Sequence, residues 1–165
     1  MARVLRRTVL GGLVLFALLQ LVPYGWWHSN PPESSVLRIR DDRAASLFEA
    51  ACADCHSNRT DWPIYSYVAP MSWLVRRDVE AGRRAFNISE YATTEHDADD
   101  AADEVEDGSM PPTQYKLAHP DARLSARERA DLADALAALE DEAEKKPDDA
   151  DDEADDRDGT NSGPG

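Results

Sequence analysis

Two cysteines and a histidine occur in the order Cys-x-x-Cys-His, at Cys52, Cys55 and His56, and the chain contains no other cysteine. On a helix these thiols lie about one turn apart, so both can add to vinyl groups on one edge of a macrocycle, while the adjacent imidazole binds the iron. This spacing is the attachment signature of c-type haem. The sequence therefore predicts one covalently attached haem c (iron), held by Cys52 and Cys55, with His56 as an iron ligand.

The second axial ligand of this iron is predicted to be Met110. It lies in Gly108-Ser109-Met110-Pro111-Pro112, where the glycine permits a turn and the prolines stiffen the segment after the sulfur. His119 is the main rival, whereas the apolar spacing around Met71 predicts a core residue. An iron with His and Met ligands has no open position, which favours electron transfer over peroxide chemistry.

Two other kinds of site use the same residue types. A dithiol or a local disulfide could form at Cys52 and Cys55, with His56 tuning the thiolate, but the sequence lacks the βαβ pattern of such redox proteins. A zinc site would need distant histidines at spacings unlike those of zinc fingers. Both interpretations remain alternatives to haem.

The elements that would position these residues are all helical. Helical patterns run from Asp41 to Ala53, from Pro70 to Gly82 and from a capping box at Ser125 to about Lys146, and a short, exposed acidic helix is expected over 97–107. The segment from Ser57 to Pro70 is rich in turn residues and aromatics. No alternation of useful length predicts a strand.

The amino terminus has the pattern of an export signal or membrane anchor. Arg3, Arg6 and Arg7 precede an apolar run over 9–22, and Trp26 and Trp27 follow it at the position of an interfacial belt. We expect an uncleaved single-pass helix in the cell membrane, because no clean small-x-small cleavage site follows the run. The positive charges on the near side predict that the remainder is extracytoplasmic.

Charge excludes some functions. The chain has 33 acidic and 18 basic residues and a formal net charge of -15, which disfavours binding to nucleic acid. Residues 141–165 contribute 11 acids and only three bases, with alanine as their only apolar residue type, and we expect a disordered tail.

Several further motifs resemble the small haem-binding domain family of membrane-anchored, c-type cytochrome-like proteins. The resemblance covers about 47–139, with departures at Ile64 and Tyr91, where aromatic and tryptophan residues are common. It implies an all-α, cytochrome c-like domain with His56 as the proximal and Met110 as the distal ligand. The matching segments are 52–58, 60–63, 68–73, 87–91, 108–112 and 119–120.

Together these observations predict an anchor or transmembrane helix at 1–28, a linker at 29–40, a haem domain at 41–140 and an acidic tail at 141–165. The expected function is that of a monohaem electron carrier, not an enzyme, with a redox protein as its partner and no small-molecule substrate. A haem sensor or accessory domain, a peroxidase-like enzyme and a haem-free thiol protein are the alternatives.

Overall fold

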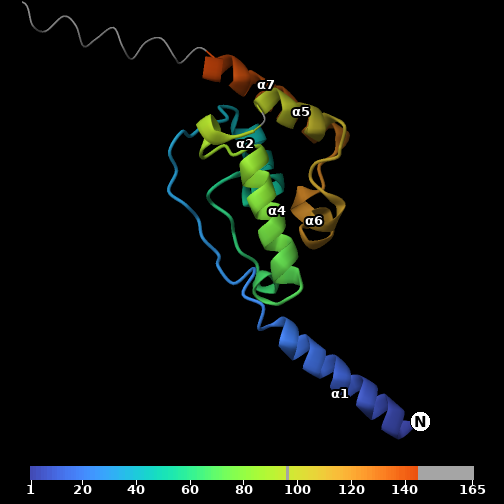
Figure 1. Ribbon diagram of the computed structural model, residues 1–165. Helices are drawn as coiled ribbons and strands as arrows, with labels where there is room; N and C mark the ends of the chain where they lie inside the picture. The colour runs from blue at the N-terminus through green and yellow to red at the C-terminus, as the bar shows by residue number, and fades with distance from the viewer. Residues whose placement is uncertain (96, 145–165) are drawn as a thin grey trace, which may run out of the picture.

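A computed structural model describes residues 1–95 and 97–144, and this part of the chain is helical (Figure 1). Within it no strand forms, and Ser35 and Glu90 make one isolated parallel bridge. The all-α prediction is confirmed; the predicted disordered tail lies almost entirely outside the described residues. The elements are α1 (Ala2–Leu19), α2 (Asp42–Ala51), α3 (Ala53–His56), η1 (Ile64–Tyr67), α4 (Met71–Ala85), η2 (Tyr91–Thr93), α5 (Ala98–Glu106), α6 (Thr113–Ala118), η3 (Pro120–Ala122) and α7 (Ala126–Glu144).

The helix predicted over Asp41–Ala53 forms in two parts. Asp41 caps α2 by accepting a hydrogen bond from the Ala44 amide at 2.7 Å. The backbone leaves helical geometry at Cys52, whose carbonyl accepts hydrogen bonds from the amides of Cys55 at 3.1 Å and His56 at 2.9 Å. The short helix α3 thus places the whole Cys-x-x-Cys-His motif on one turn.

The core lies where α7 packs against α5 and α2. The capping box at the start of α7 is confirmed: the Ser125 amide donates to Glu128 Oε2 at 2.8 Å, and the Glu128 amide donates to Ser125 Oγ at 3.3 Å. The acidic helix α5 was expected to be exposed, which is wrong for one of its faces. Its small apolar residues, spaced three and four apart, face α7 and are buried: Ala98, Ala102 and Val105.

Helix α4 passes Gly82, where the sequence predicted its end, and continues to Ala85. A Cβ atom at Gly82 would lie 2.5 Å from the carbonyl oxygen of Cys55. Glycine is therefore needed here for the close packing of α4 on α3 and not as a helix stop. The prediction missed this because the close contact joins residues distant in sequence.

Helix α1 points away from the rest of the protein and has no buried residue (Figure 1). Among the described residues, no helix combines the length and the apolar character required to cross a membrane. The predicted membrane helix is therefore not confirmed.

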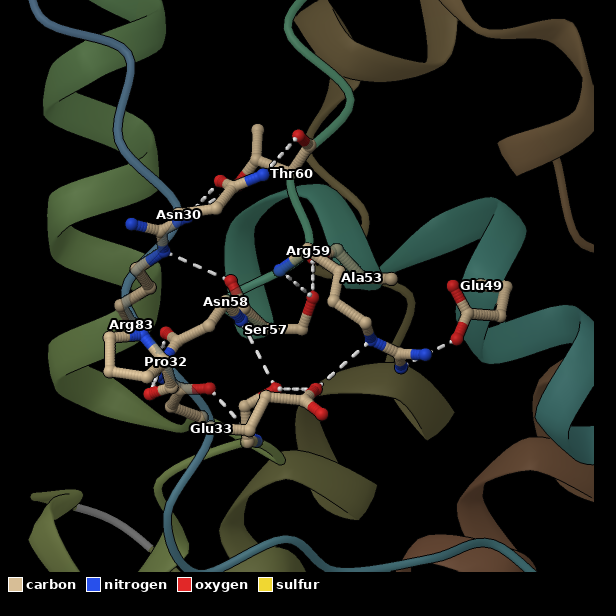
Figure 2. A network of polar contacts seen from close by, with 12 residues as sticks. Asn30, Pro32, Glu33, Glu49, Ala53, Ser57, Asn58, Arg59, Thr60 and Arg83 are labelled. Carbon is tan, nitrogen blue, oxygen red and sulfur yellow. Dashed lines mark hydrogen bonds and ion pairs between the residues drawn. The ribbon is translucent and has the colours of Figure 1, made fainter.

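Residues 28–37, which we call the strap, lie along the helical domain (Figures 1 and 2). The Ser34 amide donates to the Ser89 carbonyl at 3.0 Å, and the Asn58 side chain donates to the Pro32 carbonyl at 3.2 Å. Arg83 on α4 is the centre of this network. Its guanidinium donates to the carbonyls of Ser57 and Ser29, to Asn30 Oδ1 and to Thr60 Oγ1, at 2.8 to 3.0 Å.

Replacing Arg83 with glutamine should lower the free energy of unfolding by about 2 kcal/mol, because charge-assisted hydrogen bonds to several oxygens are lost together. Arg84→Gln is the matched control. Among the residues that the structure describes, the Arg84 side chain forms an exposed ion pair with Glu95 at 3.6 Å, so its loss should cost less than about 1 kcal/mol. Urea unfolding followed by circular dichroism measures both, and equal losses would contradict the assigned role of Arg83.

Candidate functional site

Cys52, Cys55 and His56 lie together where α3 packs against α4. Both cysteines are free thiols; Cys52 is buried and Cys55 is half-buried. Because one turn separates them and the histidine follows directly, the structure brings together the three residues that the motif singled out.

The His56 ring is oriented by the end of α4. Its Nδ1 atom lies 2.8 Å from the Phe86 carbonyl oxygen. A carbonyl can only accept a hydrogen bond, so Nδ1 carries the proton and Nε2 of the neutral ring keeps its lone pair. Burial lowers the pKa of His56, although hydrogen bonds to the Phe86 and Gly82 backbone act in the opposite direction. A neutral imidazole whose other nitrogen donates to a carbonyl is the usual form of a metal-ligating histidine.

A cavity of about 160 Å³ adjoins Cys55. Its apolar wall comes largely from α4, through Leu74, Val75 and Val79, and its other side from α6 and the segment before η1. Met71 also lines it and is 43% exposed, so the prediction that Met71 is a core residue is wrong. Its position at the first turn of α4 leaves it at the cavity edge.

Four polar side chains join across this cavity. Tyr65 Oη lies 2.8 Å from His119 Nε2, and the Tyr115 hydroxyl donates to Asp54 Oδ2 at 2.7 Å. The Tyr115 and His119 rings stack with their centroids 4.0 Å apart. Burial and the Asp54 carboxylate raise the pKa of Tyr115, so its hydroxyl stays protonated. These contacts hold α6 against α3 and η1.

Sequence reasoning missed Asp54 and Tyr115. Asp54 was treated only as a spacer within the cysteine motif. Tyr115 stands four residues before His119, which is the spacing at which two side chains on a helix stack. That spacing was the available signal for the pair.

Met110 lies in a different environment from His119. Gly108 makes the preceding turn with a φ of +78°, and the Met110 amide donates to the Glu104 carbonyl at 3.0 Å. The partly buried side chain packs against the core cluster that includes Cys52. Among the described residues, His119 lines the cavity and Met110 does not. The structure therefore places the two candidate distal ligands in different surroundings: His119 lines the cavity with Cys55, and Met110 packs against the core cluster.

These residues fit a c-type haem in their chemistry: two thiols on one turn, an oriented imidazole and an adjoining apolar wall. The cavity is smaller than the roughly 300–1,000 Å³ of typical small-molecule pockets. At its present volume the cavity does not enclose a whole porphyrin.

Comparison with known proteins agrees with this chemistry. The model of a family described as the haem-binding domain matches residues 14–138, which is most of the chain. The chain belongs to this haem-binding domain family. The expected family membership is confirmed, and with it the binding of haem.

A search of characterised proteins adds one relative. Over 133 residues the chain is 24% identical to the cytochrome c peroxidase Ccp of Escherichia coli (strain K12), covering 72% of this chain and 29% of that protein. The chain thus spans less than a third of this relative's length. No solved structure matches.

The pKa values of the thiols argue against a dithiol redox site. Burial raises the pKa of Cys52 to about 12, and burial with the nearby Asp54 and Asp78 carboxylates raises that of Cys55 to about 12. Reactive redox cysteines have lowered pKa values, since the thiolate is the nucleophile. Neither residue has this property.

A haem-free preparation should therefore react slowly with iodoacetamide near neutral pH. Raising the pKa of each thiol from 9.0 to about 12 reduces the fraction of thiolate about a thousandfold. The folded protein should therefore be alkylated about a thousand times more slowly than the urea-unfolded chain. The alkylation rate should rise as the pH is raised toward 12, because a larger fraction of each thiol is then deprotonated. Mass spectrometry measures the reaction. Equal rates for folded and unfolded chains would contradict this result and favour the dithiol alternative.

Proposed function

We propose that this protein is a monohaem c-type cytochrome with a cytochrome c-like domain that carries single electrons. Cys52 and Cys55 would hold the haem covalently, because each S–H can add across one vinyl group to give a thioether without a leaving group. His56 Nε2 is the proximal ligand. The observation that carries this proposal is the hydrogen bond from His56 Nδ1 to the Phe86 carbonyl, which orients the ring and leaves Nε2 unprotonated.

We propose Met110 as the distal ligand. Its support is the turn at Gly108, with a φ of +78°, and the packing of the partly buried methionine against the core cluster. The Nε2 atom of the rival His119 is already hydrogen-bonded to Tyr65, and this bond would have to break before His119 could bind iron through Nε2. When bound, the haem supplies one-electron reduction and oxidation, and two protein ligands leave no position for a substrate.

The location of this protein is also part of the proposal. Residues 1–28 attach it to the cell membrane, and the haem domain faces the extracytoplasmic side, where it exchanges electrons with a redox protein. The three arginines ahead of the apolar run support this orientation. The absence of buried residues in α1 supports a helix whose apolar surface is available to lipid.

One observation favours a second candidate, a peroxidase-like enzyme. The cavity beside Cys55 is lined by His119, Tyr65 and Tyr115, and the relative found by comparison is named a cytochrome c peroxidase. Peroxide chemistry would need an open iron position in place of a bound methionine, and His119 would then be a polar group near that position.

Substitution of Met110 separates the two candidates. The ferric wild-type protein should be low-spin with a sulfur-to-iron charge-transfer band. Met110→Ala should abolish this band, convert the iron toward high spin and lower the reduction potential, because the thioether ligand is lost. Met71→Ala is the matched control, since that methionine is partly exposed at the cavity edge, and it should keep the band.

Three results would contradict this assignment. A spectrum and potential unchanged by Met110→Ala would exclude Met110 as a ligand. A wild-type protein that is already high-spin would favour the enzyme. A low-spin spectrum lost in His119→Ala but kept in Met110→Ala would assign the distal position to His119.

A further inference from the structure

Large apolar side chains are exposed at the end of the domain where α1 joins it. They come from two segments far apart in sequence, one after α1 and one from η1 to the residue after it. Ile64 is 86% exposed, Trp27 65% and Tyr67 60%. We call this set the collar, and its members are Leu21, Trp26, Trp27, Ile64, Tyr67 and Val68.

The two segments of the collar are joined by direct contacts. The Gln20 side chain accepts from the Ala69 amide at 2.9 Å and donates to the Ala69 carbonyl at 3.0 Å. The His28 ring lies 4.0 Å from the Tyr67 ring, centroid to centroid. Figure 1 shows the segment after α1 beside the loop that precedes α4. The collar is therefore one surface, continuous with the exposed apolar surface of α1.

Charge at this end differs from that of the rest of the protein. Neither 20–28 nor 62–77 contains Asp or Glu, although the chain as a whole has 33 acids and a net charge of -15. The only charged residues in these two ranges are Arg76 and Arg77, which follow each other on α4. Arg76 forms an ion pair with Glu80 at 2.7 Å, and the Tyr24 hydroxyl donates to the same carboxylate. The arginine suited to anionic lipid headgroups is therefore the exposed Arg77.

We propose that the collar lies in the interface of a phospholipid bilayer, so that the end of the haem domain rests directly on the membrane. This inference rests on the membrane attachment proposed above and adds a second contact, made by the folded domain itself. Tryptophan and tyrosine favour the headgroup level, and Ile64 and Leu21 would enter the apolar boundary below it. Arg77 would face the anionic headgroups.

The collar also places the cavity close to the membrane. Pro63 and Met71 line the cavity, and they flank the collar residues Ile64, Tyr67 and Val68 in the sequence. The bound collar would therefore hold the edge of the site near the bilayer.

The test uses full-length holoprotein reconstituted into vesicles of phosphatidylcholine and phosphatidylglycerol. An environment-sensitive NBD fluorophore is attached at Ile64→Cys or, as the matched control, at Leu117→Cys. Leu117 is similarly apolar and 74% exposed, but it lies on α6, outside the collar. The wild-type chain, with Cys52 and Cys55 unchanged, gives the labelling background.

Lipids with a nitroxide near the headgroup should quench the label at position 64 about twofold or more, since interfacial side chains lie roughly 5–10 Å into this region. The label at position 117 should be quenched by less than about a tenth, because it faces water. Ile64→Glu should not alter haem absorbance, as Ile64 is exposed and outside the site.

Three other outcomes would overturn the proposal, and each would show which part of it is wrong. If the protein floats with the vesicles but position 64 is quenched no more than position 117, the collar does not touch lipid and the attachment of residues 1–28 stands. If the protein does not float, both membrane proposals fail while haem absorbance still reports the cofactor. If the label at position 64 is blue-shifted but insensitive to nitroxide lipid, a second copy of this protein covers the collar instead of lipid.

Discussion

The site depends on the close contact between α3 and the end of α4. Gly82 lets the two helices approach until its α-carbon lies against the Cys55 carbonyl, and the continuation of α4 brings the Phe86 carbonyl to His56 Nδ1. One hydrogen bond then decides both the direction of the imidazole and which nitrogen carries the proton. A histidine free to rotate beside the cysteines would have neither property, so the chemistry of the motif follows from helix packing.

The remaining elements hold this contact in place. Helix α7 packs against α5 and α2 and so supports the turn that contains Cys52. Arg83, one residue after Gly82, ties α4 to the strap and to the loop after His56. Helix α6 is held through Tyr115 and His119, by polar contacts to Asp54 and Tyr65 across the cavity. A domain this small has few apolar layers, and binding an apolar cofactor would add to its core.

Much of this could be predicted from local sequence. The motif at 52–56, the capping box at Ser125 and the periodicity of α2, α4 and α7 depend on residues within a few positions of each other. The role of Gly82, the partner of His56 and the cavity position of Met71 depend on contacts between distant segments, which a single sequence does not encode locally. Helix α6 was missed because its six residues are too few to show a period, and one face of α5 was misjudged because its alanines are small.

The central claim is that Cys52 and Cys55 hold a haem covalently. The most direct measurement is the mass of the denatured protein, made in a host with working cytochrome c maturation and compared with a Cys52→Ala/Cys55→Ala variant. The account predicts that the wild-type chain keeps the mass and the colour of one haem after denaturation and that the variant loses both. A wild-type chain with the mass of its amino acids alone would contradict it.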